Sequence, residues 1–208
     1  MITSRKKISG EAVASHYDEL DYFYREVWGD HVHHGLWRQG NETRDEAVLQ
    51  LTELVASSAR VGAGSRVCDI GCGYGATARF LAERGADVTG ITISPAQFTV
   101  AKGRLANKTN PQFVLGDWLA NDLSAGSFDA AIAIESSEHM PNLPLFFAQA
   151  HRVLRGGGRL VICAWLSAEQ PSAFATKWLL EPICREGRMP QLATAAEYRS
   201  LGLETGFD

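Results

Sequence analysis

Residues 67–75, V-C-D-I-G-C-G-Y-G, combine one carboxylate with three glycines at a spacing that suits ligand binding. The stretch begins with compact apolar side chains, breaks at Gly71, Gly73 and Gly75, and leads into a helical pattern. A strand, a glycine turn and a helix N-terminus bring free backbone N–H groups to one place. Gly71 and Gly73 would let a ligand lie against the backbone, because no Cβ stands in the way. Asp69 sits at the carboxyl end of the strand.

The loop by itself fits two nucleotide cofactors. The run Gly71-x-Gly73-x-x-Ala76 satisfies the nicotinamide fingerprint G-x-G-x-x-G/A. A nicotinamide site also needs an acidic residue about 20 residues further on, near the end of the second strand, to hold the ribose. Thr92 occupies that position, so a nicotinamide-dependent oxidoreductase is a disfavoured alternative.

The elements around the loop alternate between strand and helix. Apolar strands are expected at 67–70, 87–93, 112–115, 128–134 and 159–165, with helices at 76–84, 94–106 and 144–154. Short strands that are apolar throughout are typical of a parallel sheet covered on both faces. The pattern predicts an α/β, Rossmann-like, doubly wound and mostly parallel sheet. Its ligands would lie at the carboxyl ends of the strands.

Composition excludes several classes of partner. The chain has 208 residues, enough for one packed domain, and its net charge of −4 comes from interspersed charges, so we expect no nucleic-acid partner. No stretch is long enough to cross a membrane. Residues 1–7 are basic without a following apolar run, which predicts a mobile tail rather than a signal peptide. The four cysteines lack zinc-type spacing, which predicts reduced thiols and a cytoplasmic location.

The flanks of the core divide the chain further. We expect an N-terminal helical lid over 1–43, a cofactor-binding core over 44–166, and substrate-cap helices with the start of a truncated strand region over 167–208. Within the lid, 15–28 is predicted as one amphipathic helix with a capping box at Ser15 and Asp18. A helix at 44–60 is capped by Thr43 and Glu46. An exposed edge at the fifth strand would permit self-association.

Three histidines in the lid, His31, His33 and His34, raise the question of a metal site. Zinc needs convergent ligands at suitable spacing, and no cysteine or glutamate lies near them in the sequence. We therefore expect a polar or substrate-facing segment and no metal.

Three longer motifs resemble one family. W-G-D-H-x-H-H-G at 28–35, G-I-T-x-S-P-x-Q at 90–97 and E-S-x-E-H-M-P at 135–141 are similar to those of class I S-adenosylmethionine (SAM)-dependent methyltransferases, closest to the gamma-tocopherol methyltransferase-like group. G-I-T-x-S also resembles the cyclopropane-forming enzymes. The resemblance runs from about residue 17 to 207 and implies the class I methyltransferase fold. In that fold, two further strands normally close the sheet, and both are apparently lacking here.

The resemblance also implies roles for individual residues in binding SAM. The three glycines and Asp69 would hold its amino-acid moiety, with the carboxylate near the ammonium group. Thr92, Ser94 and Gln97 would contact the ribose. Asp117 and Trp118 would contact the adenine, and Glu135 would begin the segment beside the methyl donor.

The expected function is methyl transfer from SAM to a small, partly apolar acceptor, either a phenol, an amine or an activated carbon. His139 is the first candidate base, because an imidazole suits proton transfer near neutral pH, and Glu138 is the second. A purely structural His139, or a SAM-binding module without turnover, stays an open alternative. Further side chains would face or line the substrate pocket: Tyr24, His34, Phe146, Phe147, Trp165, Phe174 and Trp178.

Overall fold

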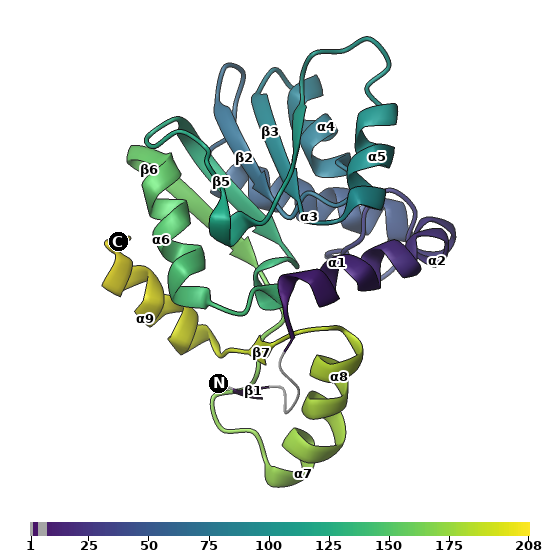
Figure 1. Cartoon of the computed structure of the whole chain (residues 1–208), viewed down its shortest axis with the longest axis vertical. Helices are drawn as coiled ribbons and strands as arrows, with labels where there is room; N and C mark the ends of the chain where they lie inside the picture. Colours follow the sequence, from purple (N-terminus) through teal and green to yellow (C-terminus); the bar gives the residue numbers. More distant parts are fainter. Residues whose placement is uncertain (1, 4–7) are drawn as a thin grey trace.

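A five-stranded parallel sheet forms the centre of the computed structural model, which describes residues 2–3 and 8–208. The strands are β2 (Arg66–Ile70), β3 (Asp87–Thr92), β4 (Gln112–Leu115), β5 (Phe128–Ile134) and β6 (Leu154–Cys163), in the order β4-β3-β2-β5-β6 (Figure 1). All four pairings are parallel. The predicted α/β fold is confirmed. The tail expected over 1–7 falls largely outside the described residues.

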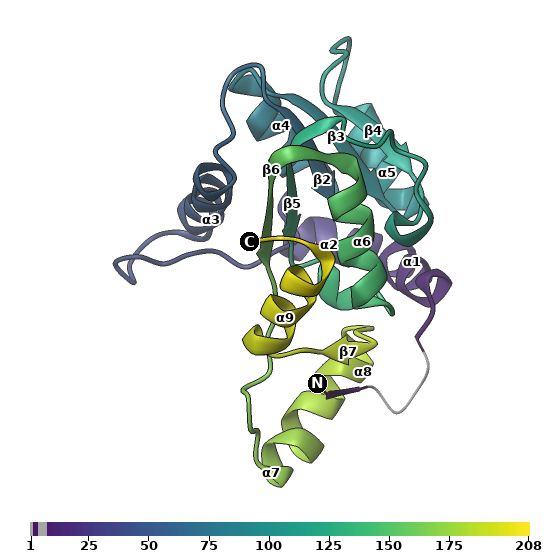
Figure 2. The ribbon, with the colours of Figure 1, turned by 90° about the vertical axis from the view of Figure 1, so that its left-hand side faces the viewer.

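Helices cover both faces of the sheet (Figure 2). One hydrophobic cluster packs α3 (Arg44–Ser58), α4 (Ala76–Glu83) and α5 (Pro95–Gly103) against β2, β3 and β5. A second packs α6 (Leu143–Val153) and α9 (Ala195–Thr205) against the other face. The inner strands β2, β3 and β5 therefore bury both of their faces, which explains why they lack polar alternation.

The N-terminal segment differs from its prediction. Residues 15–28 are not one helix but parts of α1 (Gly10–Glu19) and α2 (Asp21–Val27), which meet at Leu20. The N-cap of α1 is Ser9, whose side chain accepts a hydrogen bond from Ala12 N–H. The capping box predicted at Ser15 is therefore wrong, whereas the one between Thr43 and Glu46 of α3 is confirmed.

The C-terminal part is richer in structure than its sequence indicates. The fifth strand of the sheet, β6, begins at Leu154 rather than 159, with a register irregularity against β5. A helical stretch then runs through α7 (Ala173–Ala175), the π-helical η3 (Thr176–Leu180) and α8 (Glu181–Glu186). After α8, the short strand β7 (Gln191–Leu192) pairs antiparallel with β1 (Ile2–Thr3). α9 extends to Thr205, within the part of the chain where the start of a strand region was expected.

Candidate functional site

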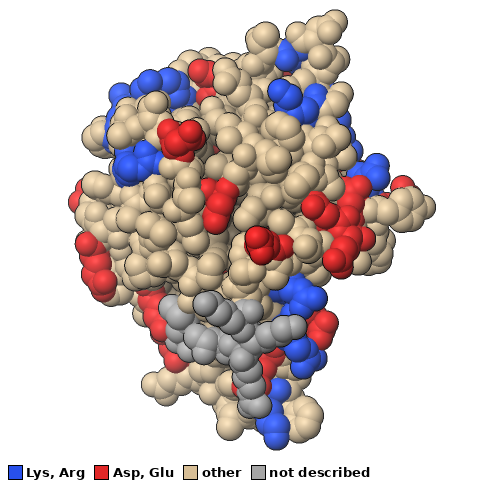
Figure 3. All heavy atoms as spheres, in the orientation of Figure 1, with Lys and Arg blue, Asp and Glu red and all other residues tan. Residues whose placement is uncertain are grey.

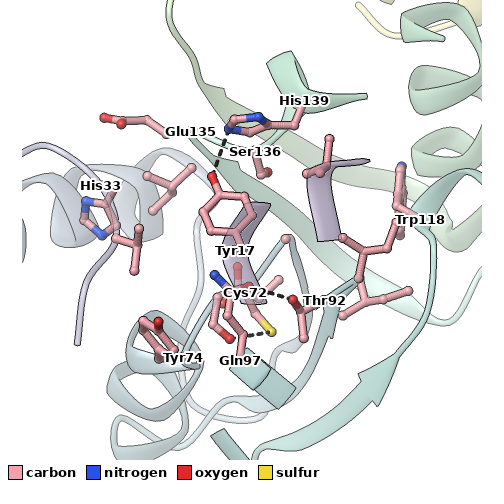
Figure 4. A pocket seen from close by; sticks show the side chains of 18 of the residues that line it. Tyr17, His33, Cys72, Tyr74, Thr92, Gln97, Trp118, Glu135, Ser136 and His139 are labelled. Atoms are coloured by element: carbon pink, nitrogen blue, oxygen red, sulfur yellow. Dashed lines mark hydrogen bonds between the residues drawn. The ribbon is translucent and has the colours of Figure 1, made fainter. Parts of the chain in front are cut away.

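One cavity lies where the carboxyl ends of β2, β3, β4 and β5 meet. Its volume is about 980 Å³, part of which is open to solvent. α1 contributes Gly10, Val13 and Tyr17 to the wall, and residues 30–33 add another side. Figure 4 shows Tyr17 reaching towards His139, with Thr92 and Gln97 on another part of the wall. The sheet therefore presents its loops to a ligand where open parallel sheets usually do.

Asp69 carries an unpartnered carboxylate oxygen. Its side chain is buried at the end of β2, and Oδ2 has no hydrogen-bond partner among residues 2–3 and 8–208. Burial raises the pKa of the Asp69 carboxyl to about 7, although the backbone N–H of Ala78 opposes the shift. Buried polar atoms are rarely left unpaired without a reason. A carboxylate in this state, in the cavity wall, favours a cationic ligand group.

The three glycines of the loop have different surroundings. Gly71 and Gly73 line the cavity, as predicted. Gly73 has φ +53°, and apart from its chain neighbours the nearest described atom to a Cβ built there is Gln97 Nε2, at 4.0 Å. Gly75 is the N-cap of α4 with φ +73°, and a Cβ there would collide with the ring of Phe113. Gly75 therefore serves helix packing and does not line the cavity.

The residues after β3 also divide into two groups. Thr92 and Gln97 both line the cavity, and the Thr92 hydroxyl donates to Gln97 Oε1 at 2.9 Å. Ser94 does not. Its Oγ accepts from Gln97 N–H at 3.1 Å and donates to Asp18 Oδ1 at 2.5 Å. The prediction that Ser94 contacts a ribose is not supported, because its hydroxyl caps α5.

Asp117 and Trp118 follow β4 and line the cavity, as predicted. Asp117 also accepts from Leu119 N–H at 2.8 Å, at the start of the 3-10 turn η1 (Trp118–Ala120). Trp118 is 3% exposed, and its indole N–H donates to the carbonyl of Phe146. Both residues therefore hold the local fold and face the cavity.

His139 is held at both ring nitrogens. It lies in the 3-10 turn η2 (Ser137–His139) after β5. Nε2 lies 3.0 Å from the Tyr17 hydroxyl, and Nδ1 lies 3.3 Å from the carbonyl oxygen of Arg188. Burial lowers the pKa of His139 to about 4 and raises that of Tyr17 well above its ordinary value. Both groups are therefore neutral near pH 7.

Glu138 points away from the cavity. Its Oε1 accepts from Trp165 N–H at 3.1 Å, and the Ser137 hydroxyl donates to its Oε2. The Ser137 hydroxyl also meets the Tyr198 hydroxyl of α9 at 2.8 Å. Burial raises the pKa of Glu138 to about 7. Glu138 is therefore not placed to act as a base in the cavity. It connects η2 to the segment after β6, and its partner Ser137 connects η2 to α9.

Most of the aromatic residues expected in the pocket lie elsewhere. Phe146 and Phe147 are core residues of α6. Phe174 and Trp178 are 68% and 60% exposed. Tyr24 bonds His16 Nε2 at 3.1 Å and does not line the cavity. The pocket role expected of Phe146 and Phe147 is wrong, because a sequence pattern does not reveal which of two apolar environments an aromatic ring enters. Phe174, Trp178 and Tyr24 lie outside the cavity wall in this structure.

The three histidines of the lid form a connected group, in which His31 and His33 line the cavity and His34 does not. His31 Nδ1 lies 3.1 Å from His33 Nε2, and His33 Nδ1 donates to the His34 carbonyl at 2.7 Å. Burial lowers the pKa of His31 to about 4. Over residues 2–3 and 8–208, no three histidine, cysteine or acidic side chains are arranged to hold a metal ion.

Sequence reasoning missed three contributors to the site. Tyr17 is one of several aromatic residues in the N-terminal segment, and no local pattern distinguishes it from the others. Asp18 also accepts from Ala96 N–H at 3.1 Å, so it joins α1 to the start of α5. Ser136 donates to the Ile70 carbonyl at 2.6 Å and holds the glycine loop against β5. Only Ser136 had a sequence signal, because it belongs to the E-S-x-E-H-M-P motif.

Charge on the surface is mixed. On the face shown in Figure 3, acidic side chains lie around the middle and basic ones mainly towards the rim. None of the helices in the described part of the chain is both long and apolar enough to traverse a bilayer. The expectation that no nucleic acid binds stays a prediction.

Comparison with known proteins identifies relatives over nearly the whole chain. The family model described as mycolic acid cyclopropane synthetase matches residues 4–207. A probable chloroplastic tocopherol O-methyltransferase of Oryza sativa subsp. japonica is 32% identical over 93% of this chain and 60% of its own length. A 2-methyl-6-phytyl-1,4-hydroquinone methyltransferase of Synechocystis sp. is 31% identical, over 89% and 61% of the two chains.

A solved structure shares the fold. The mycolic acid cyclopropane synthase CmaA1, complexed with S-adenosylhomocysteine (SAH) and CTAB, has a TM-score of 0.83 and 23% identity. The match covers 99% of this chain and 77% of that one. The chain spans about 60% of the length of the two curated relatives named above.

Proposed function

Since the chain belongs to the mycolic acid cyclopropane synthetase family, we propose that it is a SAM-dependent methyltransferase acting on a small, partly apolar acceptor. The plant and cyanobacterial relatives are named for methyl transfer, and the solved cyclopropane synthase was determined with SAH. These names support the proposal for the donor and for the class of reaction.

The observation that carries the proposal is the unpartnered Oδ2 of Asp69. SAM has an ammonium group, which would give this buried carboxylate the cationic partner it lacks. Gly71 and Gly73 would let the amino-acid moiety approach the backbone, and Asp117 and Trp118 would hold the adenine. When bound, SAM supplies a methyl group on a positively charged sulfur, which is the electrophile.

The base that we propose is the pair of Tyr17 and His139. With Nδ1–H donating to the Arg188 carbonyl, the lone pair of Nε2 accepts from the Tyr17 hydroxyl. An acceptor O–H or N–H that donates to the Tyr17 oxygen would pass its proton to Tyr17, and Tyr17 would pass its own to Nε2. Because burial lowers the pKa of His139 to about 4, this transfer would occur as the methyl group moves, when bonding to the methyl group makes an acceptor hydroxyl proton strongly acidic.

Positioning and exclusion of water are the other contributions of the chain. Val13, Ile91, Met140 and Pro141 bring apolar surface into the cavity wall beside the polar groups named above. A reaction in which the donor already carries its leaving group gains mostly from holding the two reactants in line. A mixed wall of this kind suits an acceptor with one polar reactive atom on an apolar body.

Turnover with labelled SAM tests the proposal. The purified chain would be incubated with methyl-labelled SAM and a panel of prenylated hydroquinones, macrocyclic alcohols, secondary amines and unsaturated lipids. We expect label on one class, and less label with a Gly73→Ala variant when SAM is below saturation. Tight SAH binding without label on any class would favour a binding module, and the absence of SAH binding would refute the proposal.

Two further expectations stay predictions. β6 lies at the edge of the sheet, so self-association through it is testable by light scattering after gel filtration. The four cysteines are free, which supports the cytoplasmic location that we propose from their spacing.

A further inference from the structure

Glu135, His34 and Trp165 come from three separate parts of the chain and meet at the cavity. Oε1 of Glu135 accepts from the backbone N–H of His34 at 3.0 Å. Oε2 lies 2.9 Å from His34 Nδ1 and accepts from the indole N–H of Trp165 at 3.1 Å. We call these three residues the clasp. Both oxygens of Glu135 are therefore engaged by protein donors.

The backbone of Glu135 is strained. Its φ is +47°, in the left-handed region that side-chain-bearing residues rarely adopt. Its N–H still donates to the Cys163 carbonyl at 2.7 Å, so the residue is fixed between the ends of β5 and β6. Strain of this kind persists where the surrounding contacts over-determine it, and it concentrates at ligand sites. Glu135 thus has a specific task at this position.

The ring of His34 lies between two indoles. Its centroid is 4.9 Å from that of Trp28 and 5.0 Å from that of Trp165, in both cases edge to face. The residues between Trp28 and His34 include four that line the cavity, at 30–33. Because the clasp holds His34, it also holds this stretch of wall in place.

We propose that Glu135 is a positioning residue that keeps residues 29–37 closed over the cavity, and that opening of the clasp limits release of the spent cofactor. The part of this inference that concerns the cofactor rests on the proposed function. The part that concerns closure stands on the hydrogen bonds alone. It is an alternative to the sequence-based expectation that Glu135 begins the segment beside the methyl donor.

Hydrogen–deuterium exchange of the unliganded protein tests the closure. Peptides covering 29–37 would be followed in the wild type, in Glu135→Ala, and in the control Glu83→Ala, which removes an exposed glutamate of α4 paired with Lys108. We expect exchange at His34 to rise about tenfold in Glu135→Ala, as for the loss of a hydrogen bond to a charged group. The control should match the wild type.

Trp165→Phe provides a second variant, because it keeps an aromatic ring and removes the indole N–H donor. A smaller rise in exchange at 29–37 is expected there. If Glu135→Ala fails to fold, the exchange rates of Trp165→Phe decide whether the clasp holds residues 29–37 closed. Unchanged exchange at residues 29–37 in a folded variant would show that the clasp does not hold this segment closed.

Stopped-flow release of SAH tests the coupling to the cofactor. Release from Glu135→Ala should be about tenfold faster than from wild type, with association changed by less than about twofold. Slower association with unchanged release would place Glu135 among the cofactor contacts and overturn the inference. If the wild type binds no SAH, the proposed function fails, and the exchange experiment still decides the closure.

Discussion

The hydroxyl oxygen of Tyr17 lies 3.0 Å from Nε2 of His139, across 122 positions of sequence. The other ring nitrogen faces the Arg188 carbonyl at 3.3 Å, which places the proton on Nδ1. The hydrogen bond therefore joins the N-terminal helix α1 to the loop after β5. It makes the two side chains one unit at the wall of the cavity.

Tyr17→Phe should lower kcat about 100-fold on any acceptor that the panel identifies, within the usual range for loss of a general base. His139→Gln should cost a similar factor, and the double variant should be little worse than either single one, because the two act together. Steady-state kinetics with labelled SAM measures this. Tyr22→Phe, on an exposed side chain of α2, is the matched control. If the loss of kcat in the double variant equalled the product of the two single losses, the two residues would not act as one base.

The raised pKa of Asp69 predicts that SAM affinity depends on pH. Below about pH 7 the unliganded carboxyl is protonated and must lose its proton to pair with an ammonium group. Affinity should weaken about tenfold for each pH unit between about pH 7 and pH 5.5, and binding should release a proton in that window. Calorimetry in buffers of different ionisation enthalpy measures both quantities.

Asp69→Asn is the control for that dependence. Its affinity at pH 8 should be about 10- to 100-fold weaker, as for loss of a charged partner, and nearly flat between about pH 5.5 and pH 7. An Asp69→Asn variant with the wild-type pH profile would assign the dependence to another group.

Gly73 and Gly75 should separate binding from folding. Gly73→Ala adds a methyl group on the cavity side with little nearby, so it should retain the fold, with about 1–2 kcal/mol of backbone strain, and lose at least about tenfold in SAM affinity. Gly75→Ala meets Phe113 and should lower the melting temperature more. Melting curves and titrations of both variants test this. Gly71 is a poor probe, because its Cβ would collide with Ser136.

The lowered pKa of His139 predicts acid sensitivity. A histidine whose folded pKa is below its ordinary 6.5 contributes stability above pH 6.5, and this is lost as pH falls towards 4. The free energy of unfolding of the wild type should fall by about 3 kcal/mol more than that of His139→Gln over this window. Urea titrations at several pH values measure this free energy. If it fell equally with pH in the two proteins, the acid sensitivity would not come from His139.

The sequence predicts well which strands and loops form the site, but it predicts poorly the contacts between residues that are distant in the sequence. The ranges of β4 and β5 and the placing of Asp69, Gly71 and Asp117 at one sheet edge follow from local apolar runs, glycines and chain order. Those signals lie within a few residues of the feature that they determine.

The remaining features depend on distant contacts. Asp18 caps α5 rather than its own helix, and Glu135 bonds His34 across 101 positions. The break between α1 and α2 at Leu20 lacks a proline or glycine to mark it. Phe146 reads as a pocket residue by type, yet α6 directs it into the core. All four features depend on tertiary packing, which cannot be predicted from a local sequence pattern.

The central claim is that this cavity binds SAM through Asp69. Calorimetric titration of the purified chain with SAH at pH 8, beside NADH and beside Asp69→Asn, tests it most directly. We predict one SAH site per chain, at least about tenfold weaker binding in Asp69→Asn, and no heat with NADH. A folded protein that binds no SAH, or that binds NADH instead, would contradict the account.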